Sequence, residues 1–345
     1  MVSLPPIPGP GLLINRILTH SGILNHVSPV IRGMVTSATP KPMSRKMTAV
    51  QKLRAMLADE SKIIVCPGVY DGLTARIALN VGFDCLYMTG AGTTMSRLGM
   101  PDLGIATLND MRDNAAMIAS LDRRIPLIAD ADTGYGGPLM VGRTTQQYIQ
   151  AGVAALHLED QVVNKRCGHL LNKELVDENI YQSRIRAAVN ARAESQGDIV
   201  IIARSDALQS LGMDAAIARL KSAIAIGADV AFLEGIASKE EAAHAIKELA
   251  PTPVLLNMVA GGLTPHFPVK EAQDVGFRVI IYPGLALEPV YEGFNRVATD
   301  LLKTGDVKRE GQAARGPREL FMACGMKAAM EFDVAAGGSM YSKDV

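Results

Sequence analysis

The feature that most constrains the fold is an alternation, repeated about eight times from Lys62 onward, of a short apolar run and a longer amphipathic run. The short runs are rich in Val, Ile and Leu, which is typical of parallel strands buried on both faces. The eight predicted strands span 62–68, 85–90, 125–132, 154–160, 199–206, 230–235, 253–259 and 278–284. Eight such units predict an α/β protein with a closed (β/α)8 TIM barrel.

An open, doubly wound sheet is the alternative arrangement for this pattern. The sequence has no GxGxxG after the first predicted strand and no GxxxxGK[ST], so nucleotide-binding versions of that sheet lose their main support. Segments 107–121, 213–227 and 239–250 have apolar residues at three- and four-residue spacing and predict intervening helices. The tail over 316–338 is apolar, so we expect it to pack on the barrel or on a second subunit.

Composition narrows the choice of partner and compartment. Lys+Arg and Asp+Glu are both 35, so the formal net charge gives no electrostatic reason to expect nucleic acid or an anionic membrane. The four cysteines form neither a CxxC pair nor a zinc pattern, which favours a reducing, intracellular compartment. No apolar run reaches the length of a membrane span. We therefore expect a small-molecule substrate.

The first 58 residues contain Lys and Arg but no Asp or Glu. Such a composition resembles a mitochondrial transit peptide, whereas the prolines between Pro5 and Pro10 oppose a helix at the terminus. We expect residues 1–48 to be an N-terminal extension, disordered or targeting, that precedes a catalytic unit over 49–345. The expected location is the mitochondrial matrix or the cytoplasm.

Polar residues end most of the predicted strands, at the edge where barrel active sites are built. Asp130 and Asp132 end the third strand. Two carboxylates one residue apart on an extended chain would face the same side and share a hard cation, although an Asp-rich turn that caps the next helix is the alternative. Arg204, Glu234 and Asn257 end the next strands. Arg204 can bind one substrate carboxylate, Glu234 can hold a metal-bound water, and Asn257 can orient a second carboxylate.

A cysteine follows the fourth predicted strand within a basic segment. Cys167 lies among Lys165, Arg166 and His169. Positive neighbours lower the pKa of a thiol and suit it to proton transfer or nucleophilic attack, although an ordinary loop cysteine is the alternative. Together with the strand ends, this segment predicts a pocket that can polarise a 2-oxo or 2-hydroxy acid and handle a carbanion.

From about Val50 to Gly338 the chain resembles the isocitrate lyase and phosphoenolpyruvate mutase superfamily. KRCGH, at 165–169, matches the isocitrate lyase signature. YMTGAG, PDLG, DADTGYG, HLEDQ, ARSDA, FLEG and LNMVAGG also occur, in family order. The resemblance is greatest to the short-chain members, which include methylisocitrate lyase, dimethylmalate lyase and the fungal oxaloacetate acetylhydrolase group.

The resemblance implies a metal site, a substrate site and a set of catalytic residues. Mg²⁺, for which Mn²⁺ can substitute, would be bound by Asp130 and Asp132, with Glu159 and Glu234 contacting it largely through water and Asp102 in support. Substrate-binding residues would be Thr89, Gly90, Ala91, Arg204, Asn257 and Gly168. Cys167, on a lid over 165–169, is the candidate acid; Tyr87 and Glu159 are candidate bases, and Lys165 and His169 complete the catalytic set. Family members exchange C-terminal helices in a dimer of dimers, which implies a homotetramer.

The activity implied is a Mg²⁺-dependent carbon–carbon lyase that cleaves a 2-hydroxy dicarboxylate or tricarboxylate, a 2-substituted malate or a methylisocitrate-like acid, to a 2-oxo acid and a carboxylate. Hydrolysis of oxaloacetate to oxalate and acetate is the alternative; that branch needs a serine, and neither 257–262 nor 282–286 contains one. A phosphonomutase is disfavoured because those enzymes lack the lid thiol. The remaining alternative is a silent barrel that binds a dicarboxylate or serves in an assembly.

Overall fold

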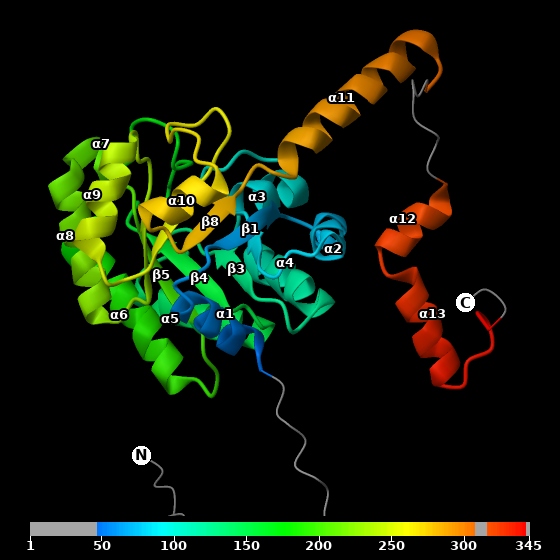
Figure 1. The fold of residues 1–345 in the computed structure, drawn as a ribbon, viewed down its shortest axis with the longest axis horizontal. Helices are drawn as coiled ribbons and strands as arrows, with labels where there is room; N and C mark the ends of the chain where they lie inside the picture. The colour runs from blue at the N-terminus through cyan, green and yellow to red at the C-terminus, as the bar shows by residue number, and fades with distance from the viewer. Residues whose placement is uncertain (1–46, 308–315, 343–345) are drawn as a thin grey trace, which may run out of the picture. The chain divides into compact units, whose positions relative to one another are not determined.

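The computed structural model describes residues 47–307 and 316–342, and it contains a closed barrel of eight parallel strands (Figure 1). The strands are β1 (Ile64–Val69), β2 (Leu86–Met88), β3 (Leu127–Asp130), β4 (Ala155–Glu159), β5 (Val200–Ser205), β6 (Val230–Leu233), β7 (Val254–Asn257) and β8 (Val279–Tyr282). Each strand pairs with the next in sequence, and β8 pairs with β1 from Ile64↔Val279 to Pro67↔Tyr282. The predicted (β/α)8 barrel is confirmed.

Helices connect the strands and surround the barrel (Figure 1). They are α1 (Ala49–Ala58), α2 (Gly72–Val81), α3 (Gly90–Leu98), α4 (Leu108–Leu121), α5 (Pro138–Ala151), α6 (Glu178–Glu194), α7 (Leu208–Leu211), α8 (Met213–Ile226), α9 (Lys239–Leu249) and α10 (Val269–Val275). They are followed by α11 (Leu287–Thr304), α12 (Pro317–Ala323) and α13 (Met326–Ala335). The three predicted amphipathic segments are helices α4, α8 and α9.

The core has two layers because alternate residues of each strand point in opposite directions. On β5, Val200 and Ile202 belong to a cluster that fills the barrel interior, whereas Ile201 and Ala203 pack against the surrounding helices. The interior cluster contains Tyr87, Phe232 and other inward side chains of the strands. A filled interior confines any binding site to the mouths of the barrel.

Helix α1 covers the amino-terminal mouth. Its buried residues, Ala49 and Leu53, belong to the same cluster as the barrel interior. Arg54 on this helix binds Asp198 (Nε to Oδ2, 2.7 Å) and Asp229 (Nη1 to Oδ1, 3.1 Å), which lie just before β5 and β6. The carboxyl-terminal mouth is therefore the one left for chemistry.

The predicted extension over 1–48 lies, except for its last two residues, outside the described residues, so its targeting role stays a prediction. Helix α1 begins at Ala49 and is capped by the Thr48 side chain, which accepts a hydrogen bond from the Gln51 backbone. Among the described helices, none combines the length and apolar character that a membrane crossing requires.

Candidate active site

Alternate residues of each strand point into the barrel. They are apolar along most of the strand and polar at its carboxyl end. On β5, Val200 and Ile202 face inward, and two residues further the same parity brings Arg204 to the mouth. The corresponding residues of β3, β4 and β7 and the residue directly after β6 are Asp130, Glu159, Asn257 and Glu234. All of them are buried. Five neighbouring segments of the barrel thus place their predicted site residues at one edge.

The two aspartates of the third strand are joined by a turn. Asp130 ends β3, whereas Asp132 has φ +46°, in the left-handed region, and its backbone N–H donates to Asp130 Oδ1 (2.9 Å). The turn closes where Gly134 N–H donates to the Ala131 carbonyl (2.8 Å). The chain is therefore not extended through Asp132, as the prediction assumed, because it turns after Asp130. Left-handed backbone at a non-glycine residue is costly and is concentrated at functional sites.

Lys165 is an internal cation of the site. Its Nζ lies 2.7 Å from Asp132 Oδ1 and is also paired with Asp102. Burial raises the pKa of Asp132 to about 6 although the ammonium opposes this shift. Burial alone would lower the pKa of Lys165, but Asp132, Glu159 and Asp102 hold it well above its usual range. Lys165 is therefore an ammonium here. Its ion pairs with Asp102 and Asp132 connect Asp102 to the site.

Arg204 is shared by three carboxylates. It binds Asp206 with two hydrogen bonds (Nε to Oδ2, 2.9 Å; Nη2 to Oδ1, 3.0 Å), and its Nη1 lies 3.2 Å from Glu159 Oε2. Its Nη2 lies 3.5 Å from Glu234 Oε2. Burial raises the pKa of Glu159 well above its usual range despite Arg204. Burial would also raise the pKa of Glu234, but Arg204 and then His169 lower it below its usual range.

The donor set fits a hydrated divalent ion. Both oxygens of Glu159 and Oδ1 of Asp132 are buried without hydrogen-bond partners, although Lys165 and Arg204 are close enough to form ion pairs with them. Carboxylate oxygens are the ligands that Mg²⁺ prefers. Among the residues that the structure describes, no three His, Cys, Asp or Glu side chains are grouped to hold an ion directly. Mg²⁺ usually keeps several waters, so one or two direct carboxylates suit it.

Tyr87 and His157 form the floor of the site. The Tyr87 hydroxyl lies 2.9 Å from His157 Nε2, which lies 3.5 Å from Asp130 Oδ1. Burial, with Arg204, lowers the pKa of His157 to about 3, so the imidazole is neutral. Burial, with Asp130, raises the pKa of Tyr87 well above its usual range. The phenol keeps its proton, which opposes the candidate base role. His157 was not predicted, although its inward position on β4 was readable from the alternation.

The predicted substrate-binding residues at the end of β2 begin helix α3. The Thr89 hydroxyl caps this helix and accepts a hydrogen bond from Gly92 N–H (3.2 Å). A Cβ atom at Gly90 would collide with the Asp130 carboxylate, so only glycine allows this approach. Ala91 is half-buried in the first turn. The start of α3 therefore lies directly against one aspartate of the candidate metal site.

The KRCGH segment, predicted to be a lid over 165–169, belongs to a longer loop, residues 161–175. From here on, we call this whole loop the lid. Its ends are paired by an antiparallel bridge between Gln161 and Leu175. A Cβ atom at Gly168 would collide with Arg204 and Glu234, so the lid is packed tightly on both. The lid therefore lies closed over the charged edge of the barrel.

His169 binds across the mouth. Its Nδ1 accepts a hydrogen bond from Leu263 N–H (3.2 Å), so its Nε2 carries a proton, which it donates to Glu234 Oε1 (3.2 Å). Asn257 Nδ2 donates to Glu234 Oε2 (3.0 Å). The predicted residues Glu234, Asn257 and His169 are thus in mutual contact.

Cys167 lies half-buried on the lid, and its electrostatic surroundings differ from the prediction. Burial raises the pKa of the thiol above its usual value, and the backbone N–H of His169 opposes this only in part. The Lys165 ammonium is paired with Asp132 and Asp102 instead. The prediction of a lowered thiol pKa is therefore wrong, because burial outweighs the basic neighbours. The thiol is protonated, which suits an acid better than a nucleophile.

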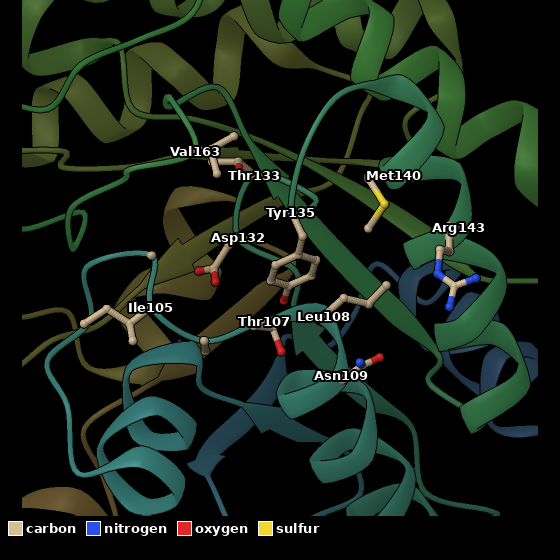
Figure 2. A pocket seen from close by; sticks show the side chains of 12 residues that line it. Ile105, Thr107, Leu108, Asn109, Asp132, Thr133, Tyr135, Met140, Arg143 and Val163 are labelled. Carbon is tan, nitrogen blue, oxygen red and sulfur yellow. The ribbon is translucent and has the colours of Figure 1, made fainter.

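Asp132 also borders a cavity of about 360 Å³ (Figure 2). Figure 2 shows its carboxylate and the Tyr135 ring pointing into this space, with Ile105 and Thr107 opposite. Cys167 and Arg204 are not among the lining residues. The cavity therefore reaches the candidate metal carboxylate from a side that contains neither the thiol nor the guanidinium.

Comparison with known proteins identifies the family. The family model described as phosphoenolpyruvate phosphomutase matches residues 53–302. The 2,3-dimethylmalate lyase of Eubacterium barkeri is 41% identical over 239 residues, which are 69% of this chain and 80% of that protein.

Two solved structures are equally similar in sequence, at 52% identity. One is an oxaloacetate acetylhydrolase in complex with 3,3-difluorooxalacetate (TM-score 0.82, covering 85% of this chain and 99% of that chain). The other is a 2,3-dimethylmalate lyase (TM-score 0.83, covering 86% and 98%). The family predicted from KRCGH and its companion segments is confirmed: the chain belongs to the phosphoenolpyruvate mutase and isocitrate lyase superfamily.

Proposed function

We propose that this chain is a Mg²⁺-dependent carbon–carbon lyase that cleaves a 2-hydroxy dicarboxylate of the 2-substituted malate type. The observation that carries the proposal is the convergence of a buried guanidinium, Arg204, with carboxylate oxygens that lack hydrogen-bond partners and with a protonated thiol, Cys167, on the closed lid. A dimethylmalate lyase among the relatives supports this substrate class.

The proposed mechanism assigns separate atoms to the two proton transfers. Arg204 binds a substrate carboxylate, and Glu159, whose ionised form Arg204 and Lys165 favour, accepts the proton of the 2-hydroxyl group. The burial that raises its pKa makes this carboxylate a stronger base. The bond between C2 and C3 breaks, C2 becomes the carbonyl carbon of a 2-oxo acid, and the electron pair stays on C3. The Cys167 thiol then donates its proton to C3, which completes the carboxylate product.

The proposed metal would be held by Asp130 and Asp132, directly or through water, with Glu159 and Glu234 contacting it through water. Bound there, Mg²⁺ supplies positive charge that polarises the C2 oxygen and stabilises the negative charge that moves during cleavage. Lys165 neutralises part of the same carboxylate cluster, and the lid excludes water from it.

Hydrolysis of oxaloacetate is the second candidate. It is favoured by the solved oxaloacetate acetylhydrolase, which is as similar to this chain as the solved dimethylmalate lyase. It is disfavoured by the lack of serine in 257–262 and 282–286. A binding protein without activity would leave the protonated thiol and the carboxylate oxygens that lack hydrogen-bond partners without a role, so we place it last.

A substrate screen separates these functions. With Mg²⁺, the purified protein should cleave 2,3-dimethylmalate to pyruvate and propionate at a higher kcat/KM than it cleaves methylisocitrate or oxaloacetate. Products are measured by chromatography. Release of oxalate from oxaloacetate, without any 2-oxo acid from the hydroxy acids, would show a hydrolase. Lack of turnover on all three would contradict both enzymatic proposals.

Replacing the proposed acid should slow cleavage without affecting the metal. For Cys167→Ser we expect kcat to fall about 10²-fold or more, because a hydroxyl is a much weaker proton donor than a thiol. The affinity for Mn²⁺, measured by calorimetry, should stay unchanged. The matched control is Cys324→Ser, which alters a thiol that is exposed in the single chain and lies outside the site. Equal turnover in both variants would remove Cys167 from the mechanism.

Metal affinity should depend on pH through Asp132. Because burial raises the pKa of this carboxyl to about 6, a proton competes with the ion below that pH. Mn²⁺ affinity should therefore fall about tenfold for each pH unit below this pKa and level off above it. Asp132→Asn should bind weakly at every pH, whereas Asp113→Asn, at an exposed position, should retain the wild-type profile. An affinity that is flat from about pH 5 to 7 contradicts this assignment.

The assembly that we propose is a homotetramer in which the C-terminal helices bury apolar side chains against neighbouring subunits. Phe294 and Leu302 on α11 and Phe332 on α13 are 73%, 88% and 76% exposed in the single chain. Burying such residues between subunits is favourable. Light scattering after size-exclusion chromatography should give the mass of four 36.7 kDa chains. A monomer at micromolar concentration would refute the proposal.

A further inference from the structure

Lys173 is a buried cation of the lid that the proposed chemistry does not use. Its side chain is only 2% exposed. Its ammonium donates to the Gly168 carbonyl (2.6 Å) and to Asp206 Oδ1 (2.9 Å). Burying an ammonium is costly unless it is paired and hydrogen-bonded. The two partners therefore fix where the Lys173 side chain can lie while the lid is closed.

Asp206 is itself held in one place. Its backbone N–H donates to Asp160 Oδ1 (2.8 Å), and the other oxygen of Asp160 accepts from Ser205 Oγ (2.7 Å) and Arg219 Nη1 (3.2 Å). The Asp206 carboxylate also receives both hydrogen bonds from Arg204, and its Oδ1 accepts from Lys173 as well. Asp206 is thus a fixed junction between the substrate-binding guanidinium and the lid.

Gly168 completes the link on the lid side. Its carbonyl accepts from Lys173, and its Cα has no room for a side chain against Arg204 and Glu234. Cys167 directly precedes it, and the Cys167 carbonyl accepts from Leu170 N–H (2.9 Å) in a tight turn. A movement of Gly168 away from the barrel must therefore carry the thiol with it.

We propose that Lys173 is a positioning residue that holds the lid closed. We call its contacts with the Gly168 carbonyl and Asp206 the latch. It ties the Gly168 carbonyl to the carboxylate that orients Arg204, so that closing the lid and aligning the guanidinium become a single event. The importance of the latch for catalysis rests on the proposed function, whereas its effect on lid closure does not. Removing the ammonium leaves the Gly168 carbonyl without its partner and leaves Asp206 Oδ1 bound to Arg204 alone. The lid then opens more often and exposes Cys167.

The test uses the full chain and measures how fast iodoacetamide alkylates each cysteine, read by peptide mass spectrometry. In Lys173→Met, Cys167 should react about tenfold faster than in the wild type, because local opening limits its access to the reagent. Cys324, which is exposed, should react at the same rate in both proteins. Unchanged alkylation of Cys167 in the folded variant overturns the proposal.

Two controls separate the latch from a loss of stability. Lys221→Met removes an ammonium that binds Glu248 at 2.8 Å on the surface, and it should leave Cys167 protected. Cys66 and Cys85 are buried and report on the fold. If they also react in Lys173→Met, the fold has failed, and Lys173→Gln decides instead, since it keeps a donor but lacks the charge. Cys167 should then react faster while Cys66 and Cys85 stay protected; a protected Cys167 overturns the latch.

Kinetics distinguish a failure of the latch from a failure of the proposed function. If the wild type cleaves a 2-hydroxy dicarboxylate, Lys173→Met should raise KM and lower kcat, because Arg204 and Cys167 are no longer held together. If the wild type cleaves none of the acids, the proposed function fails, but the alkylation rates still decide whether Lys173 holds the lid.

Discussion

The carboxyl end of the barrel holds more buried negative charge than its cations balance, and the rest of the site follows from this imbalance. Asp130, Asp132 and Glu159 share Lys165 and Arg204, which have further acidic partners of their own. Buried carboxylates persist only with a cation, a hydrogen bond or a proton. One of the two cations, Lys165, belongs to the lid. Closing the lid therefore changes the charge of the site as well as its access to water.

The barrel divides the proposed work between rigid and movable parts. Asp130, Glu159 and Arg204 lie on strands, which hold charged side chains more precisely than loops do. Cys167 lies on the lid, and no strand constrains it. A fixed charged frame with a movable acid allows the substrate to enter before the proton donor arrives. Helix α1 supports this division, because it packs over the opposite mouth and confines the site to the carboxyl end.

The sequence predicted the barrel and the residues of its mouth, because the alternation of side chains along a strand is a local property. The predictions from sequence were wrong where the outcome depends on tertiary structure. The turn at Asp132 overrides the expected pleat, and burial reverses the expected pKa shift of Cys167. Lys173 gave no signal, since its partners, Gly168 and Asp206, are brought together only by the closed lid. Local pattern thus located the site, whereas burial determined its electrostatics.

The similarity to both a lyase and a hydrolase has a chemical explanation in this site. Cleavage of a substituted malate and hydrolysis of oxaloacetate both leave an electron pair on a carbon next to a carboxylate. Both therefore need a proton donor on that side of the broken bond, and a protonated Cys167 held next to Arg204 can serve either reaction. The reactions differ at C2, where one loses a hydroxyl proton and the other gains water. The choice between them therefore depends on the groups that surround C2, and the lack of serine in 257–262 and 282–286 favours the lyase.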